Sequence, residues 1–350
     1  MTDQRVGDDA VPCGMPGESE LRRDLLIKSG QSHILRIADA DSNAAAPVPC
    51  VIAIGAFDGC HRGHQELLAH AVKDACVRRV SAFAVTFDPD PDEVLSNSPA
   101  LRLMSMDDRL SALSACGVSV AVVPFTPKLA VLDHRAFFED VLAAVLDIQS
   151  IHVGSDFRLG ARGASNVEVI RAWGAVRGIE VTGHELLTDG DAPITATRIR
   201  ASMARGDIES AAFELGRRPL VRGRVGHGRG EGAGMGFPTA NIVVGSRMQL
   251  PADGVYAGCV AVEGEVWPAA INVGVPPMFA DSPASARLEA NLLGFKGDLY
   301  GAEVGVLFER RLRPSCSFES LDDLIRAVGN DIETVRTHYG EEPVRLARDF

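Results

Sequence analysis

Two glycine-rich segments constrain most strongly what this chain of 350 residues can fold into. The first, GAFDGCHRGH, runs from Gly55 to His64, and the second, GRVGHGRGEGAGMGFPTAN, runs from Gly223 to Asn241. Glycine lets backbone N–H groups approach an anion closely, so each segment has the character of a nucleotide-binding loop. The patterns that flank them differ, which predicts two domains of different architecture, each with its own phosphate site.

The first half of the chain is patterned as an α/β sheet. Short apolar runs of the buried parallel-strand type alternate with helical spacing, which predicts an open Rossmann-type sheet with right-handed crossovers. Predicted strands lie at residues 50–57, 81–88, 119–125 and 150–157, with helices that include one from near His64 and one from Arg135 to Leu146. Residues 1–32 are mixed and polar, so we expect a loosely ordered tail there.

The pattern changes near residue 204. A helical stretch is followed by short β-type runs separated by Gly and Pro, which predicts an antiparallel barrel, and helical spacing returns from Ser320 to Tyr339. The predicted division is a tail at 1–32, an α/β domain at 33–203, a linking helix at 204–217 and a barrel domain at 218–340.

Composition excludes several classes of protein. The net charge of -12 argues against a nucleic-acid surface, which needs clustered cations. The seven cysteines form no CxxC pair, which favours reduced thiols in a cytoplasm over disulfides or zinc. No apolar run is long enough to span a membrane, and the first residues do not have the pattern of a secretory signal. We therefore expect a cytoplasmic protein that binds small molecules, and the oligomeric state stays open.

The first segment has the features of a phosphate site in an open sheet. It follows a strand and opens a helix, where ligands bind beyond the carboxyl ends of strands and where helix N–H groups are unpaired. His61 and His64 are three residues apart and can face one phosphate group, where an imidazole can stabilise charge at phosphorus. Taken alone, two histidines at a helix start are explained at least as well without any function.

The second segment matches neither a Walker A loop nor a dinucleotide fingerprint. Its glycine run alone is best explained as a flexible surface loop. The residues after it are more specific, because Thr239 and Asn241 lie two apart on one face of an extended strand. Their hydroxyl and amide oxygens are hard ligands suited to Mg²⁺ that carries ATP.

Several motifs in order resemble the bacterial bifunctional riboflavin kinase/FAD synthetase family. The spacing from Gly55 to His64 is similar to its nucleotidyltransferase signature, and the element PTAN, which ends at Asn241, is similar to its riboflavin kinase motif. Further matching segments are TFDPDP (86–91), GSDFRLG (154–160), TATRIR (195–200), LPADGVY (250–256) and DLYGAEVGVLF (298–308). The resemblance covers residues 33–338.

The resemblance implies an FMN adenylyltransferase α/β domain followed by a riboflavin kinase barrel with a C-terminal helix. The barrel would phosphorylate riboflavin to FMN with ATP and Mg²⁺, and the first domain would join AMP to FMN, giving FAD. The implied catalytic residues are Glu289, which would accept the ribityl hydroxyl proton, and His61, His64 and Arg198. Thr239 and Asn241 would bind the metal ion. The implied nucleotide- and flavin-binding residues are Gly55, Phe57, Asp58, Gly59, Gly63, Gly154, Asp156, Phe157, Arg158, Thr197, Arg200, Gly223, Gly234, Gly236, Phe237 and Pro238.

The chain departs from the family's pattern at both sites. Ala56, Asp90 and Ala196 stand where the family usually has Asn, His and Ser, and Ala233, Met278 and Ala290 stand where Arg, Thr and His are usual. A lost charge-assisted donor costs about 1.5–3 kcal/mol, and a carboxylate beside a polyphosphate adds repulsion. We therefore expect a weakened adenylyltransferase and a better preserved kinase. A paralog that acts as a kinase only or on a modified flavin, and a non-catalytic flavin- or nucleotide-binding regulator, remain alternatives.

Overall fold

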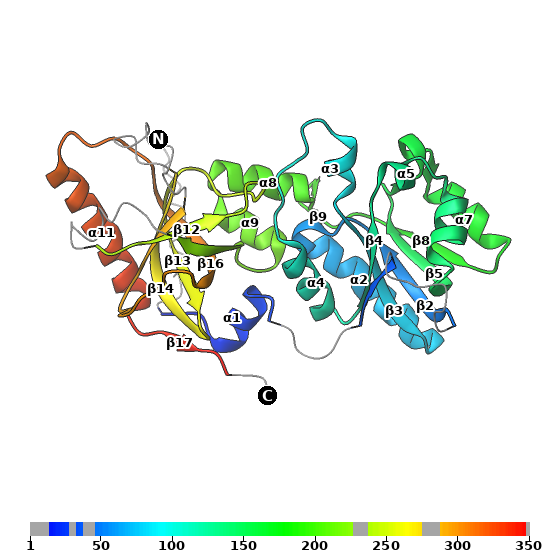
Figure 1. The fold of residues 1–350 in the computed structure, drawn as a ribbon, viewed down its shortest axis with the longest axis horizontal. Coiled ribbons are helices and arrows are strands. Elements are labelled where there is room, and N and C mark those ends of the chain that lie inside the picture. Colours follow the sequence, from blue (N-terminus) through cyan, green and yellow to red (C-terminus); the bar gives the residue numbers. More distant parts are fainter. Residues whose placement is uncertain (1–13, 28–32, 38–45, 227–236, 275–287, 348–350) are drawn as a thin grey trace, which may run out of the picture.

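The computed structural model describes residues 14–27, 33–37, 46–226, 237–274 and 288–347. It forms two bodies joined by short helices, with the barrel at the left and the α/β domain at the right of Figure 1. None of the helices in these ranges is both long enough and apolar enough to cross a membrane.

The α/β domain contains a six-stranded sheet in the order β1-β4-β3-β2-β5-β8, and every neighbouring pair is parallel. The parallel sheet confirms the predicted fold class. The strands are β1 (Ile34–Arg36), β2 (Val48–Ile54), β3 (Ser81–Asp88), β4 (Ser119–Pro124), β5 (Leu146–Gly154) and β8 (Glu180–His184). The helices are α2 (Arg62–Arg78), α3 (Pro91–Leu95), α4 (Met106–Ala115), α5 (Pro127–Ala130), α6 (His134–Ala136) and α7 (Val167–Ala175). Shorter elements are η2 (Asp58–Cys60), η3 (Phe137–Leu142), η4 (Ala161–Gly163), β6 (Arg158–Leu159), β7 (Ser165–Asn166), β9 (Thr188–Asp189) and β10 (Ala192–Pro193).

Strand β2 shows why an unbroken apolar run marks the centre of this sheet. Successive side chains of a strand point to opposite faces, so a strand buried on both faces needs apolar residues throughout. Val51 and Ala53 pack into the core on one face, whereas Ile52 and Ile54 pack into the core on the other. The predicted helix from Arg135 to Leu146 is interrupted, because α6 passes into a single π-helical turn, η3.

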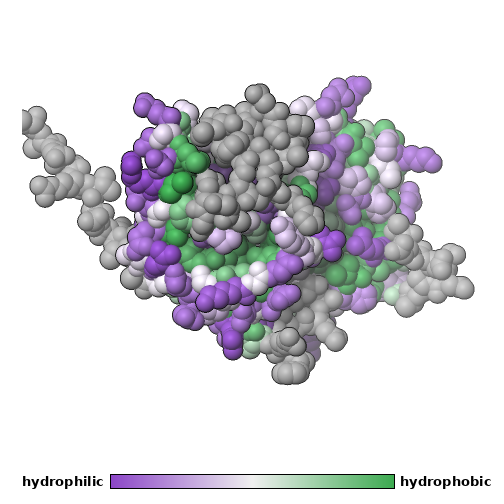
Figure 2. All heavy atoms as spheres, turned by 60° about the vertical axis from the view of Figure 1, so that its left-hand side comes forward, coloured by the Kyte–Doolittle hydropathy of each residue, from purple (hydrophilic) through white to green (hydrophobic). Residues whose placement is uncertain are grey.

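The second domain is a closed antiparallel barrel, as the sequence predicts. Its strands run in the order β13-β16-β11-β12-β15-β14, and pairing of β13 with β14 closes the barrel, with β17 added at the outer edge of β14. The C-terminal helix α11 (Leu321–Tyr339) buries Ile332 and Val335 against the outside of the barrel. The strands are β11 (Leu220–Gly226), β12 (Ala240–Val244), β13 (Gly254–Val262), β14 (Glu265–Val273), β15 (Leu288–Leu292), β16 (Glu303–Pro314) and β17 (Val344–Arg345). In Figure 2 this side of the molecule is apolar toward its centre and largely polar around it.

The linking helix predicted over residues 204–217 corresponds to the shorter α9 (Ile208–Leu215), and it follows α8 (Ala196–Arg205), which ends inside the predicted range. Gly206 ends α8 in the left-handed region with φ of 76°, which favours glycine, and the Asp207 side chain caps α9 by accepting from the Ser210 N–H. Ile208 packs into the barrel core, whereas Leu215 packs with α8. Helix α9 therefore packs against both the barrel and α8.

A helix also occupies part of the predicted tail. Helix α1 (Glu18–Asp24) lies between the barrel and α4 in Figure 1, and Leu21 and Leu25 are buried in a core to which both domains contribute. The fully buried Asp24 carboxylate lies 2.6 Å from Nη1 of Arg218 at the start of the barrel. The prediction of a loosely ordered tail is therefore wrong for residues 14–27. The polar composition concealed two leucines at i and i+4, which place one apolar face on a short helix.

Candidate active sites

The first glycine-rich segment leaves the carboxyl end of β2 and is bound tightly to β3. The Gly55 N–H donates to the Val85 carbonyl at 3.1 Å, and the Thr86 hydroxyl donates to the Ala56 carbonyl at 3.1 Å. Phe57 follows in the left-handed region with φ of 55°, and its side chain is buried. The segment is therefore a well-held turn between β2 and α2.

The imidazole rings of His61 and His64 stack, with their centroids 3.6 Å apart, so the two side chains lie on the same side of the helix start. Burial lowers the pKa of His61 to about 4, and the cations Arg217 and Arg200 contribute to that shift. Burial also lowers the pKa of His64 well below its usual value, with His61 as the second cause. Both rings are therefore neutral at pH 7. Their Nδ1 atoms are buried and have no hydrogen-bond partner in the described part of the chain.

The backbone at this turn favours glycine at Gly59, and the His61 side chain leaves little room beside Gly63. Gly59 has φ of 77°, a conformation that favours glycine, and its carbonyl accepts from Nη2 of Arg217 at 2.7 Å. A Cβ atom on Gly63 would lie 3.3 Å from the His61 ring. A side chain at Gly63 would therefore press on the imidazole.

Asp58 and Arg200, both predicted to bind nucleotide, pair with one another. The Asp58 carboxylate is 4% exposed, accepts from the Leu103 N–H at 3.0 Å and lies 2.6 Å from Nη2 of Arg200. Nε of Arg200 donates to the Leu101 carbonyl at 2.6 Å. The pair thus fastens the turn and α8 to residues 101–103.

Arg198, the predicted catalytic arginine, has three partners. Its Nε lies 2.6 Å from Oε1 of Glu214 on α9, its Nη2 lies 2.6 Å from Oδ2 of Asp189, and its Nη1 donates to the Ala192 carbonyl at 3.0 Å. Glu214 is 1% exposed, whereas the Asp189 side chain is 43% exposed. Breaking a buried ion pair costs about 3–5 kcal/mol, and an exposed pair contributes about 0–1 kcal/mol. The contact with Glu214 is therefore the costly one to break.

Residues of the predicted flavin-side loop follow β5, next to the first segment, because β2 and β5 are adjacent and parallel. Gly154 ends β5, and Asp156 and Arg158 are exposed beyond it, while Phe157 is partly buried against the sheet core. Thr197 is exposed in the first turn of α8. These side chains line the carboxyl edge of the sheet and can reach a ligand there.

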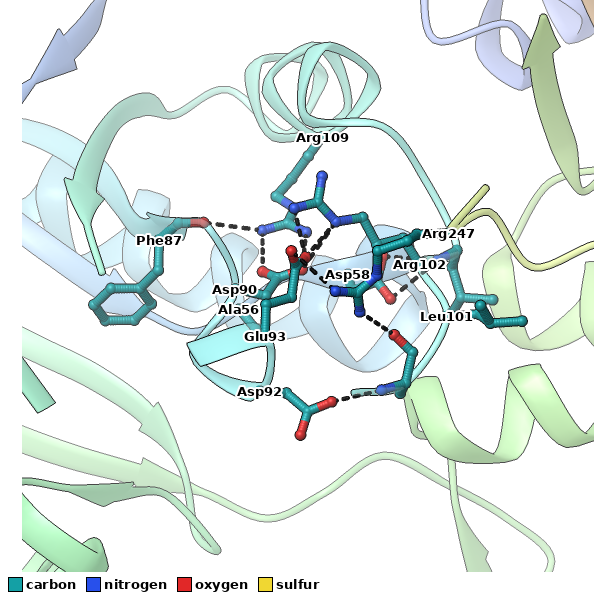
Figure 3. A network of polar contacts seen from close by, with 12 residues as sticks. Ala56, Asp58, Phe87, Asp90, Asp92, Glu93, Leu101, Arg102, Arg109 and Arg247 are labelled. Carbon is teal, nitrogen blue, oxygen red and sulfur yellow. Dashed lines mark hydrogen bonds and ion pairs between the residues drawn. The ribbon is translucent and has the colours of Figure 1, made fainter. Parts of the chain in front are cut away.

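Asp90 is held by a buried cation that the sequence did not suggest. Figure 3 shows Arg109 of α4 directed at this carboxylate, with Nη1 to Oδ1 at 2.6 Å and Nη2 to Oδ2 at 2.8 Å. Arg109 is 1% exposed, and its Nη1 has a further weak contact with the Phe87 carbonyl at 3.3 Å. The repulsion predicted for Asp90 is thereby reduced, because its charge is paired.

The same network reaches the barrel. Arg102 pairs with Glu93 at 2.5 Å, and Glu93 lies 3.3 Å from Nη1 of Arg247, which follows β12 (Figure 3). The Arg102 N–H donates to the Arg247 carbonyl at 2.7 Å, and the Gln249 N–H donates to the Arg102 carbonyl at 2.8 Å. The loop that carries Asp90 is therefore joined by backbone hydrogen bonds to the segment that follows the strand of Asn241.

The second candidate site is assembled by strand register. Asn241 on β12 lies directly opposite Glu289 on β15, and Glu289 in turn lies opposite Asn272 on β14. Directly opposed residues on antiparallel strands have Cβ atoms about 4.5–5.5 Å apart. Thr239 lies just before β12, two residues from Asn241; all three predicted residues are partly exposed, while Ala290 is buried in the barrel core. The structure thus brings together the predicted metal ligands and the predicted base.

Three other predicted residues of this site, Gly223, Phe237 and Pro238, take part in packing or hydrogen bonding within the barrel domain. A Cβ atom on Gly223 would lie 2.6 Å from the Ile242 side chain and the Val243 carbonyl, so glycine lets β11 approach β12. Phe237 packs with α11 residues, and the Pro238 carbonyl accepts from Nδ2 of Asn291 at 2.8 Å. The predicted residues Gly234 and Gly236, and the departures Ala233 and Met278, lie outside the described residues.

Comparisons with known proteins agree with both domains. The FAD synthetase family matches residues 43–198, and the riboflavin kinase family matches residues 215–339. The chain is 32% identical to the bifunctional riboflavin kinase/FMN adenylyltransferase of Pseudomonas fluorescens, over 82% of this chain and 92% of that protein. The corresponding protein of Escherichia coli K12 is 33% identical over 83% and 93%. A solved structure described as a macrolide-efflux protein from Streptococcus pneumoniae superposes with a TM-score of 0.77 at 29% identity, covering 87% of this chain and 98% of that one.

Proposed function

The chain belongs to the bifunctional riboflavin kinase/FMN adenylyltransferase family, and we propose that it performs both reactions of that name. The barrel phosphorylates riboflavin to FMN with ATP, and the α/β domain transfers AMP from ATP to FMN, giving FAD and pyrophosphate. The observation that carries this proposal is the pairing of Asn241 with Glu289, since it joins a metal ligand and a base from separate segments on one face of the barrel wall. We further propose that the protein acts in the cytoplasm and binds neither nucleic acid nor membrane.

In the kinase reaction, Glu289 accepts the proton of the terminal ribityl hydroxyl as that oxygen attacks the γ-phosphate of ATP. Thr239 and Asn241 supply a hydroxyl and an amide oxygen, which suit Mg²⁺. When bound, the ion neutralises charge on the transferred phosphoryl group. The partial exposure of these residues and the pairing of Asn241 with Glu289 support this assignment.

In the adenylyltransferase reaction, a phosphate oxygen of FMN attacks the α-phosphate of ATP, and pyrophosphate leaves. His61 and His64 act as neutral hydrogen-bond donors to phosphate oxygens, and Arg198 supplies positive charge. The position of the two stacked rings at the start of α2 supports their role. We expect this activity to be the weaker of the two, because Ala56 and Ala196 offer no side-chain donor.

The test is incubation of the purified chain with riboflavin, ATP and Mg²⁺, followed by chromatographic separation of the flavins. FMN together with FAD is the expected outcome. FMN alone would restrict the chain to the kinase reaction. Unchanged riboflavin, in a sample that binds flavin, would refute the kinase assignment, and a parallel incubation with FMN and ATP that yields no FAD would refute the adenylyltransferase and favour a binding protein.

A further inference from the structure

Helix α9 forms one wall of the first site, although it lies outside the nucleotidyltransferase motifs. Nε2 of Gln65 on α2 donates to the Leu215 carbonyl at 2.9 Å, and the guanidinium of Arg62 lies 4.5 Å from the centre of the Phe213 ring. Between these two contacts, Glu214 reaches Nε of Arg198. The linking helix therefore touches the predicted catalytic arginine directly.

The two carboxylates on Arg198 differ in surroundings. Neither oxygen of Glu214 has a hydrogen-bond partner elsewhere in the described ranges, so Arg198 is its compensating charge. Burial raises the pKa of Glu214, and the Arg198 charge opposes that effect. Asp189 lies on the short strand β9 and is much more exposed, so water can replace its contact with Arg198.

The guanidinium has donors to spare for a ligand. An arginine side chain carries five N–H groups. Asp189 and the Ala192 carbonyl accept one each from Nη2 and Nη1, and Nε is in ion-pair contact with Glu214. A phosphate that displaces Asp189 gains further donors on the Nη edge, while the Nε edge stays on Glu214.

We propose that Glu214 is a positioning residue for adenylyl transfer, which anchors the Nε edge of Arg198 while the phosphates of ATP replace Asp189 on the other edge. This inference rests on the proposed adenylyltransferase function. Because Ile208 anchors the same helix in the barrel core, the barrel takes part in placing Arg198.

Steady-state kinetics of FAD formation with Glu214→Ala, Glu214→Gln and Asp189→Asn tests the proposal. Glu214→Ala should raise KM for ATP and lower kcat, reducing kcat/KM by about tenfold to a hundredfold, as expected for loss of a positioned charge-assisted contact. Glu214→Gln keeps the shape of the side chain but not the charge that pairs with Arg198, so it should lose nearly as much activity as Glu214→Ala. Asp189→Asn should act in the opposite direction and lower KM for ATP, by up to about fivefold.

Riboflavin phosphorylation by the same samples shows whether each variant is folded, because the proposed kinase residues lie on or next to β12 and β15, away from Glu214 and Asp189. Unaltered KM for ATP in Glu214→Ala, or a rise in KM with Asp189→Asn, would overturn the proposal. Equal losses of FAD and FMN formation, together with a lower unfolding temperature in both Glu214 variants, would reduce Glu214 to a structural role and also overturn it. Absence of FAD formation by the unaltered chain would refute the proposed adenylyltransferase instead.

Discussion

Asp90 should be essential for stability because it is the carboxylate partner of a buried arginine. In Asp90→Asn, Arg109 loses the negative charge that pairs with it and keeps one amide oxygen together with its 3.3 Å contact with the Phe87 carbonyl. Removing one member of a buried ion pair costs about 3–5 kcal/mol. For a domain of about 150–250 residues, each kcal/mol lowers Tm by about 2–4 °C, so we expect a decrease of roughly 6–20 °C.

Thermal unfolding followed by circular dichroism measures this effect, with Glu93→Gln as the matched control. Glu93 belongs to the same network, but its partners Arg102 and Arg247 are more exposed, with 25% and 36% of their side chains accessible. The control should therefore lose about 0–1 kcal/mol. Replacing both partners, as Asp90→Asn with Arg109→Met, should recover most of the loss, because apolar groups tolerate burial without a partner.

The same reasoning changes what is expected from restoring the histidine that is usual in the family. Asp90→His places a ring beside Arg109 that cannot neutralise it, so this variant should unfold at a lower temperature and gain no FAD formation. The reasoning is refuted by a Tm for Asp90→Asn within about 1 °C of the unaltered chain, since loss of a buried ion pair requires a decrease of several degrees. A stable Asp90→His variant that makes FAD faster would refute it as well.

The remaining predictions concern the kinase, acid stability and separability. Glu289→Ala should lose at least tenfold in FMN formation, since general bases contribute about 10²–10⁴, and near-normal kinetics would remove it from the mechanism. Asn241→Ala should raise the Mg²⁺ concentration needed for half-maximal FMN formation; an unchanged requirement would contradict its role as a ligand. The pKa of His61 is 6.5 in the unfolded chain and about 4 in the folded chain. Its contribution to the free energy of unfolding is therefore fully present above pH 6.5 and is lost as the pH falls toward 4. Measured by urea unfolding, the free energy of unfolding should fall with acid by about 3 kcal/mol less in His61→Ala than in the unaltered chain. The same pH dependence in both proteins would contradict this prediction. A fragment of residues 204–350 should make FMN but no FAD, and a folded but inert fragment would show that the kinase reaction is assigned wrongly.

The sequence predicts the two architectures well because each has a local signature. The unbroken apolar run around Ile52 follows directly from burial on both faces of the sheet. The strand pairing that joins Asn241 to Glu289 could not be derived from spacing, because register between strands far apart in the chain depends on the closed barrel. The family resemblance identified Glu289 as the predicted base, and the structure shows that Asn241 lies opposite it.

The charged contacts were the least predictable feature. From the sequence, Asp90 is expected to repel a polyphosphate, since no cationic residue lies close to it in the chain. Its partner Arg109 comes from α4, nineteen residues further on, and points inward from a helix that also carries acidic residues. Likewise, Glu214 belongs to a helix whose sequence shows only a link between domains, and its contact with Arg198 depends on how α9 packs on α8.

The two sites consequently differ in what they require of the rest of the chain. Thr239, Asn241 and Glu289 lie on, or next to, neighbouring strands of one barrel, so the arrangement depends on strands of that domain alone. The first site draws on the linking helix, since Glu214 contacts Arg198 and Arg217 holds the Gly59 carbonyl. Helix α9 is itself fixed by burial of Ile208 in the barrel. We therefore expect adenylyl transfer to need both domains in place, and phosphorylation of riboflavin to depend chiefly on the barrel.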